Sequence, residues 1–580
     1  MQSEMVDQTG ERRTTSRRRL LRGAAAAGGG LAGAWLIACG GDGGGGQESG
    51  GAEERFQQSG AANTATVGGT GTIDRSVGKT GGRMVGSIGE PDSLDPHRDA
   101  GFPGVQVVNG VYSTLWRGYI PPGQSPIIEG DLVQSYEQPD NLSLVMKFPA
   151  GIKWQNAPPV NGREFTSEDV KLNFERMATD QPGFGLAPFL TMVSGVETPD
   201  KQTVKVNFSF PYAPFILNMA DGWPVIIPRE LYKGDDAKTQ AVGTGPFIMT
   251  RRERGVGVFL DRNPDYFKKD ASGNALPYLD GIDWVIFPDA STSLSAFITK
   301  KLDMRGISPA DEDKVKDAVP DVKVQEAIGA PFLFDLNMEY PQLKDKRVRE
   351  AIKYAVDYDL VMNIGMLGLA VRGQPLSNSM RGYILDKGDL PVRDVAKAKQ
   401  LLSAAGFPNG LELEDWIPNN YIPDVGHTQI QQGLKEAGIE LKFRITDWTP
   451  WRTGGYGIEP ANPPLQTTST AIFVFLNPDR QLWVDYHTGA ANNNSRYASS
   501  GFDKLLNDAR KEFDQAKQQT IYKDAAKMLI DDTPAVFISE SLSRYYYHSH
   551  LKNWLPDDGS TNFLHYKKYD YVWLDGVPSR

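Results

Sequence analysis

The sequence contains a single cysteine, Cys39, among its 580 residues. No disulfide can therefore form within the chain, and no second thiol is available as a nucleophile. The hydrolase pattern G-x-S-x-G and the zinc-protease pattern H-E-x-x-H are both missing. Among six scattered histidines, only His548 and His550 could share one strand face, and no nearby cysteine or carboxylate completes a metal site. We predict no catalytic residues, no metal and no cofactor.

The chain also lacks a basic surface. Its formal net charge is −10, and residues 1–38 carry a local excess of positive charge, so the remainder is more acidic still. A nucleic-acid surface needs clustered lysine and arginine to meet the phosphates. We therefore expect no nucleic-acid partner.

Apolar residues make up 40% of the sequence and aromatic residues 10%, which is enough to fill several cores. A chain of this length exceeds one hydrophobic core, so two to four domains are expected.

The N-terminus has the features of an export signal. Residues 16–22, SRRRLLR, resemble the twin-arginine signal, and the weakly apolar segment that follows is too short for a membrane span. Residues 36–39, LIAC, resemble a bacterial lipobox. Cys39 is either a stray thiol or the lipidated residue of a lipoprotein, and its position favours lipidation. Two acyl chains would give stable membrane anchoring. Residues 1–38 are predicted as the signal peptide, and 39–79, rich in glycine and serine, as a flexible linker.

Local patterns predict a strand followed by a capped helix between residues 142 and 177. Apolar residues alternate along residues 142–148, which is the period of a half-buried strand. Thr166 lies three residues before Asp169, the spacing of a capping box at a helix start. Val170, Phe174 and Met177 then share one face of the helix.

A set of short segments resembles the family 5 extracytoplasmic solute-binding proteins, the peptide and nickel group of ABC importers. The similarity is carried, in the order of the family, by residues 90–96 (EPDSLDP), 151–177, 243–247 (GTGPF), 262–266 (RNPDY), 345–352 (DKRVREAI), 398–406 (AKQLLSAAG) and 437–439 (AGI). Each segment alone is a weak signal. Their collinear order almost to the C-terminus identifies the chain as a member of the family.

The resemblance implies an α/β fold of the periplasmic-binding-protein type II, bilobal with an extra small domain, so that three lobes are built from discontinuous segments. The expected segments are 80–126, 201–308 and 545–580 for lobe I, 127–200 for the small lobe II, and 309–544 for lobe III. At least two strands would cross between lobes and bend as hinges. We expect a monomer.

The region most informative about the ligand is residues 466–483, QTTSTAIFVFLNPDRQLW. Peptide-binding members carry here a tryptophan and then an aspartate that pairs with the free amino terminus of the peptide, shortly before an Asp-Pro or Glu-Pro. Asn477-Pro478 resembles that landmark, which places Val474 where the aspartate is expected. No carboxylate lies between Gln466 and Leu476. Because a buried ammonium without a partner is costly, this weighs against the usual recognition of a free peptide amine.

Aromatic residues remain as candidates for ligand contact. By the resemblance, Trp448 falls where oligopeptide binders carry a cleft-lining tryptophan, and Trp451 and Phe473 lie close to it in sequence. Phe102 lies in the loop that borders the cleft in the family. Each of these rings could instead pack in the core or anchor its loop.

The function implied is that of a solute-binding lipoprotein of an ABC importer, held outside the cell on the outer face of the cytoplasmic membrane. It would capture a peptide-class or other small molecule, such as an oligosaccharide, by lobe closure and deliver it to the permease subunits. The alternatives are a secreted, lipid-anchored hydrolase and a sensory receptor that does not transport.

Overall fold

The computed structural model describes residues 75, 77–98, 102–120, 126–179, 186–187, 190–418, 425–447, 451, 466–471, 475–490, 492–554 and 569–576. Cys39, the signal peptide predicted for residues 1–38 and most of the linker predicted for residues 39–79 lie outside these residues; of the predicted linker, only residues 75 and 77–79 are described. Within them, no helix is long and apolar enough to cross a membrane.

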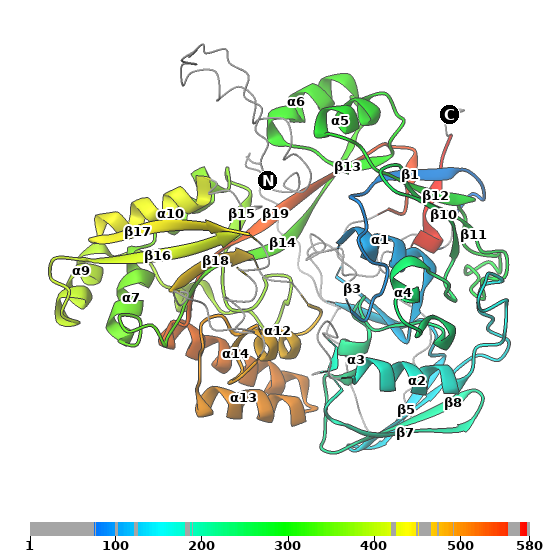
Figure 1. Cartoon of the computed structure of the whole chain (residues 1–580), viewed down its shortest axis with the longest axis horizontal. Coiled ribbons are helices and arrows are strands. Elements are labelled where there is room, and N and C mark those ends of the chain that lie inside the picture. Colours follow the sequence, from blue (N-terminus) through cyan, green and yellow to red (C-terminus); the bar gives the residue numbers. More distant parts are fainter. Residues whose placement is uncertain are drawn as a thin grey trace, which may run out of the picture.

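One large mixed sheet runs through both halves of the molecule in Figure 1. Its strand order is β10 (Phe247–Glu253), β11 (Gly257–Arg262), β12 (Gly281–Val285), β1 (Arg83–Ser87), β13 (Met304–Gly306), β19 (Ala535–Tyr547), β14 (Lys323–Leu336), β18 (Thr467–Ala471), β16 (Leu411–Pro418) and β17 (Ile439–Thr446), with β15 (Ala370–Arg372) on β19. The long strands β14 and β19 pair antiparallel, from Lys323 opposite Tyr547 to Asp335 opposite Ala535. These two strands connect the halves.

A second sheet of four strands lies at the lower right of Figure 1. Its order is β5 (Ser135–Asp140), β6 (Ser143–Lys147), β8 (Thr203–Phe208) and β7 (Val193–Asp200). Short two-stranded pairs are formed by β2 (Ser113–Thr114) with β9 (Val225–Ile226), β3 (Trp116–Tyr119) with β4 (Ile127–Gly130), and β20 (Leu551–Lys552) with β21 (Trp573–Leu574).

Helix α2 (Ser167–Met177) packs on the four-stranded sheet. The predicted capping box is confirmed: the backbone N–H of Thr166 donates to Asp169 Oδ2 at 3.0 Å, and the reciprocal bond is also present. Val170, Phe174 and Met177 are buried, as their helical spacing predicts.

The other helices are spread over the molecule. They are α1 (Phe102–Val111), α3 (Phe215–Met219), α4 (Asp236–Thr239), α5 (Ala290–Ile298), α6 (Pro309–Ala318), α7 (Lys346–Ala355), α8 (Tyr358–Leu360), α9 (Val395–Ala404), α10 (Val425–Glu436), α12 (Pro478–Tyr486), α13 (Ser500–Lys511) and α14 (Gln515–Asp532), with short η3 (Arg229–Leu231), η4 (Val361–Gly365), η5 (Lys387–Asp389) and η7 (Tyr569–Tyr571). Not all of them lie on the large sheet: Phe215 of α3 packs against Phe174 of α2 and against Phe208 of the four-stranded sheet. Gly406 and Gly438 follow α9 and α10 with φ of +95° and +90°, the left-handed conformation that ends a helix.

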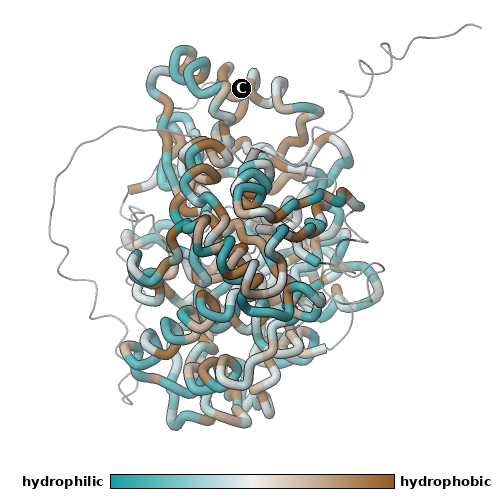
Figure 2. The backbone as a smooth tube through the Cα atoms, turned by 90° about the vertical axis from the view of Figure 1, so that its left-hand side faces the viewer, coloured by the Kyte–Doolittle hydropathy of each residue, from teal (hydrophilic) through white to brown (hydrophobic). Residues whose placement is uncertain are grey.

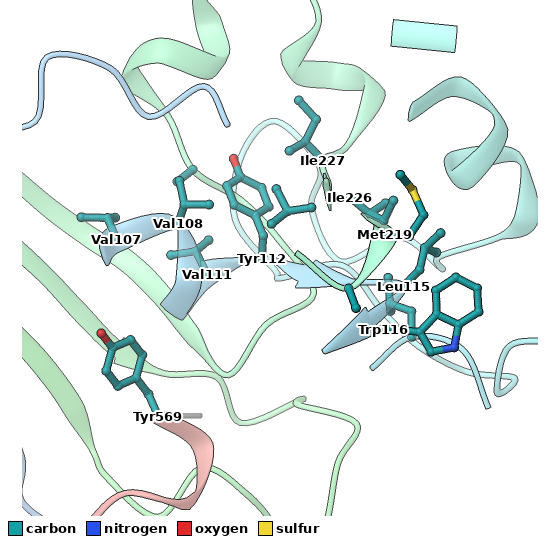
Figure 3. Close-up of a cluster of buried hydrophobic side chains, with 14 of the residues drawn as sticks. Val107, Val108, Val111, Tyr112, Leu115, Trp116, Met219, Ile226, Ile227 and Tyr569 are labelled. Atoms are coloured by element: carbon teal, nitrogen blue, oxygen red, sulfur yellow. The ribbon is translucent and has the colours of Figure 1, made fainter. Parts of the chain in front are cut away.

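The buried apolar side chains divide the described chain into two bodies. The largest core cluster joins residues from Met84 to Met304 with the C-terminal residues from Tyr545 to Leu574, and we call this the first body; Ala327 and Leu476, from the chain in between, also pack in this cluster. Figure 3 shows part of this core, in which Val108, Val111 and Tyr112 lie together and Tyr569 of the C-terminal segment lies apart from them. Two further clusters formed by residues 333–538 make the second body. In Figure 2, hydrophobic segments run through the interior and hydrophilic ones through many outer turns. The four-stranded sheet shares the core of the first body, and the lobe boundaries stay a prediction.

Two glycines are required where α1 ends. A Cβ atom at Gly243 would lie 2.0 Å from the carbonyl oxygen of Val111, and one at Gly245 would lie 2.6 Å from it. That carbonyl accepts hydrogen bonds from the Gly245 N–H at 2.9 Å and from Gln155 Nε2 at 3.2 Å. The GTGPF segment therefore needs glycine because two backbone segments touch, whereas its glycines do not have the positive φ of a tight turn.

Candidate functional site

The second body meets the first directly after residues 472–474, which lie outside the described residues. Phe475 packs in the second body with α12, α13 and α14, whereas its neighbour Leu476 is buried in the core of the first body. Leu476 touches Gly118 so closely that a Cβ there would lie 2.1 Å from Leu476 Cδ1. Trp223 packs against the cores of both bodies. Figure 1 shows α12 of the second body facing α3 of the first. In the sequence, Val474 comes directly before Phe475, but its own placement lies outside the described residues.

A buried polar network connects the two bodies at this junction. Asp479 of α12 accepts hydrogen bonds from Arg510 Nε and from the Tyr212 hydroxyl, both at 2.6 Å. The Tyr212 oxygen accepts from Asn218 Nδ2 at 2.6 Å, and Asn218 Oδ1 accepts from Asn477 Nδ2 at 2.5 Å. All five side chains are buried. Burial, together with the negative charge of Asp479, raises the pKa of Tyr212, so its hydroxyl stays a proton donor.

A second contact between the bodies is the ion pair of Asp221 with Arg480, whose Oδ1 and Nη1 atoms are 3.3 Å apart. Both side chains are buried, at 2% and 8% exposure. Burial raises the pKa of Asp221 despite the charge of Arg480, and burial lowers the pKa of Arg480. Each group therefore depends on the other to remain charged, which ties α12 to the segment after α3.

Trp451 is the one candidate ring whose side chain the structure places. It is buried, and its Nε1 donates to Thr468 Oγ1 at 2.9 Å. Thr468 donates in turn to the carbonyl oxygen of Trp416 at 2.8 Å, so the indole is fixed beside β18 and β16. Its N–H group is therefore used inside the protein.

The other candidates are not placed with Trp451. Trp448, Phe473 and Val474 lie outside the described residues. Phe102 begins α1, and its side chain is likewise not described.

Two buried aspartates lie on the strands beside β18. Asp415 of β16 accepts from Ser469 Oγ at 2.7 Å and from Thr467 Oγ1 at 3.2 Å, and burial raises its pKa to about 6. Ser469 thus donates its proton to a carboxylate and not to an imidazole, which is not the arrangement of an activated serine nucleophile. Asp335 of β14 is directly opposite Thr468, and burial raises its pKa to about 7. Neither acid was among the site residues predicted from the sequence, because the search for an acid was confined to the segment between Gln466 and Leu476.

The two closely spaced histidines bind separate partners. His548 Nε2 lies 2.8 Å from the carbonyl oxygen of Phe297, and His550 Nε2 lies 2.6 Å from Asp303 Oδ1. Their rings stack at 5.4 Å, and the described residues contain no group of three His, Cys, Asp or Glu side chains that could hold a metal.

The junction residues were also missed from the sequence. Asp479 and Arg480 are consecutive charges directly after Asn477-Pro478, but the sequence does not show that they are buried, which only the structure reveals. Their partners could not be named, because Tyr212 lies 267 positions from Asp479.

A mixed α/β chain with two bodies joined by long paired strands has the fold of the type II periplasmic binding proteins. The structure of DppA from Helicobacter pylori in complex with the peptide STSA has a TM-score of 0.73 and 23% sequence identity, covering 86% of this chain and 99% of that one. AgaA from A. tumefaciens R10, in complex with agropinic acid, has a TM-score of 0.72 at 24% identity, with coverage of 86% and 99%. The expected fold class is confirmed.

Residues 128–493 match the model of the bacterial extracellular solute-binding proteins, family 5. The glutathione-binding protein GsiB of Pectobacterium atrosepticum is 26% identical over 427 residues, which are 70% of this chain and 79% of the relative. The chain belongs to family 5 of the bacterial extracellular solute-binding proteins, as the collinear segments predicted. These relatives are binding proteins and not enzymes.

Proposed function

We propose that this protein captures a solute between its two bodies and delivers it to the permease subunits of an ABC importer. The observation that carries the proposal is the junction itself: β14 and β19 cross between the bodies, and the polar network of Asp479 on α12 joins them. Bending of the crossing strands would close the predicted lobes over the ligand. The ligand would shift this equilibrium only by its higher affinity for the closed state.

The ligand class follows from a missing charge. GsiB is named for glutathione, and the similar structures hold a peptide in one case and agropinic acid in the other. In this chain Val474 stands where peptide-binding members carry the aspartate for a free amino terminus. We therefore propose a peptide-class or other small solute, an oligosaccharide among them, whose recognition does not use an ammonium group at that position.

The test of the proposed function is to identify what the protein carries. Mass spectrometry of small molecules released from the purified, full-length protein should reveal a solute, and titration with that compound should be saturable without turnover. Conversion of the compound to product would favour the hydrolase alternative. Binding without any effect on uptake in a permease-containing strain would favour the sensory receptor.

Replacing Trp448 with alanine is expected to weaken binding of the recovered solute by about 1–3 kcal/mol, because an aromatic ring stacked on the solute is lost. Calorimetric titration measures the change. An unchanged affinity combined with a lower melting temperature would show that Trp448 is a core residue. Replacing Trp451 with phenylalanine provides a comparison for the change in affinity, because the Trp451 N–H already donates to Thr468 within the protein.

Replacing Cys39 with serine is expected to move the protein from the membrane fraction to the soluble fraction of the cell envelope. The reason is that the proposed lipid anchor, with two acyl chains, supplies essentially all of the membrane affinity. Fractionation followed by immunoblotting measures the distribution. Equal membrane retention of both forms would contradict lipidation at Cys39.

A further inference from the structure

The crossing strand β19 carries a row of three serines. Ser539, Ser541 and Ser543 alternate along the strand, so their side chains lie on one face at intervals of about 7 Å. They are 0%, 5% and 8% exposed. β13 pairs with β19 at residues 545–547, in the first body, and β15 pairs with it at residues 539–541, in the second body. The row therefore begins beside β15 and ends at Ser543, between the two flanking strands, where β19 crosses beside β14 (Figure 1).

The residues opposite the serines place this row between the cores of the two bodies. Side chains directly opposite each other in antiparallel strands lie on the same face of the sheet. Ser543 is opposite Ala327, which is buried in the core of the first body. Ser541 is opposite Ala370, which packs against a core of the second body. One face of β19 thus leads from the second body to the first.

On the other face of β19, the protein supplies partners for the polar groups. The Glu540 carboxylate accepts hydrogen bonds from the backbone N–H and from Nδ2 of Asn378, both at 2.7 Å, and from the Ser377 hydroxyl. Arg544 Nε pairs with Glu326 Oε1 at 2.7 Å, and its Nη1 pairs with Glu312 Oε2 at 3.2 Å. The charged groups on this face are therefore engaged within the protein.

The serine face does not receive such partners. Within the part of the chain that the structure describes, the Oγ atoms of Ser539 and Ser543 are buried without a hydrogen-bond partner. Ser541 Oγ lies 3.5 Å from the carbonyl oxygen of Ala330, which is at the limit of a hydrogen bond. A buried hydroxyl normally has a partner, because an unpaired one lowers stability. Two unpaired hydroxyls on one strand face point to a partner that is not part of the chain.

The row carries no charge that is free for a solute. The one charged residue directly opposite a serine of the row is Arg372, which is opposite Ser539. Its guanidinium donates to the carbonyl oxygens of Phe537 and Ile538, and it stacks on the Tyr358 ring at 3.5 Å from the centroid. The groups left for recognition are therefore hydroxyls, which both donate and accept hydrogen bonds.

We propose that Ser539, Ser541 and Ser543 form a subsite that hydrogen-bonds the neutral polar groups of the solute. The inference rests on the proposed function, because a solute held between the two bodies lies against the strands that cross between them. Peptide amides and sugar hydroxyls offer the same chemistry to a serine, namely a donor and an acceptor without charge. Such recognition needs no carboxylate, in agreement with the valine at position 474.

The binding test uses two uncharged probes, N-acetylated and C-amidated trialanine and maltotriose. Calorimetric titration of the full chain is expected to show saturable binding of at least one probe, and the probe that binds shows whether amides or sugar hydroxyls are recognised. Ser543→Ala should weaken its binding about fivefold, and the double variant Ser539→Ala with Ser543→Ala should weaken it at least tenfold. Ser167→Ala, at the start of α2, should leave the affinity unchanged.

A second measurement needs no ligand. Replacing an unpaired buried hydroxyl with a methyl group removes the cost of burying it, so Ser543→Ala should melt about 1–2 °C higher than the natural protein. Ser167 is also buried, but its hydroxyl donates to the carbonyl oxygen of Asp200 at 2.5 Å, so Ser167→Ala should melt lower. A gain in stability together with a loss of affinity is typical of a residue that serves binding.

Three outcomes overturn the subsite. A lower melting temperature of Ser543→Ala with unchanged affinity would show that this serine is structural. Equal affinity of the natural protein and the double variant for the bound probe also overturns the subsite, while leaving solute binding intact. Binding of neither probe overturns it as well, and if no solute is recovered from the purified protein either, the proposed function fails with it.

Discussion

Replacing Asp479 with alanine is expected to lower the free energy of unfolding by about 3–5 kcal/mol and to loosen the junction between the two bodies. The substitution leaves the Arg510 guanidinium buried without its carboxylate and the Tyr212 hydroxyl without its acceptor. Both side chains are at most 2% exposed, so water cannot replace the lost partner. Urea titration measures the stability, and small-angle scattering measures the radius of gyration, which should increase.

The control for this prediction is the double variant Asp479→Leu with Arg510→Met. Apolar side chains of similar volume remove both charges, so no uncompensated ion remains, and much of the lost stability should return. The Arg510 guanidinium also stacks on Trp483, at 3.1 Å from the ring centroid, and methionine preserves part of that packing. If the double variant is as unstable as Asp479→Ala, the loss arises from packing and not from a stranded charge.

The parts of the fold that could be predicted from the sequence depend on interactions between residues that are close together in the sequence. The capping box of α2 joins Thr166 to Asp169, and the glycines after α9 and α10 act within a single turn. Leu441, Phe443 and Ile445 alternate with charged residues, a local pattern that indicates a strand, and this segment forms β17. Ile445 is nevertheless 54% exposed, because β17 is the edge strand of the sheet. Apolar alternation in the sequence does not show which side chains are covered by other elements.

The candidate site could be predicted only in part, because its polar contacts join distant segments. The absence of an acid at position 474 is visible in the sequence, whereas the contacts of Asp479 with Tyr212 and Arg510 require α12 to pack against the first body and against α13. The same holds for Asp221 and Arg480, which belong to different bodies. A buried charge and an exposed charge have the same letter in the sequence, and only packing distinguishes them.

The second large effect is expected at Arg117, whose replacement by methionine should cost about 3–5 kcal/mol of folding free energy. Arg117 Nη1 pairs with Asp570 Oδ2 at 2.7 Å, its Nε pairs with Asp131 Oδ1 at 3.0 Å, and its Nη2 donates to the Tyr266 hydroxyl at 2.7 Å. The arginine and both acids are at most 1% exposed on their side chains. It holds the C-terminal segment against β3, so the variant should also expose that segment to proteolysis.

The pH dependence of the Arg117 variant shows whether lost charge pairing is the cause. Burial alone would raise the pKa of Asp131, but the charges of Arg117 and Lys268 outweigh it and hold this pKa below its ordinary value. A depressed pKa contributes stability that is present above the unfolded pKa and is lost as the pH falls through the folded pKa. Without Arg117 the pKa of Asp131 rises, so acid unfolding should begin at a higher pH.

The matched substitution Arg251→Met, at an exposed pair with Glu253, should change stability by less than about 1 kcal/mol. If the two substitutions change stability equally, or if the pH of acid unfolding does not shift in the Arg117 variant, burial of the Arg117 network adds nothing to the stability of the fold.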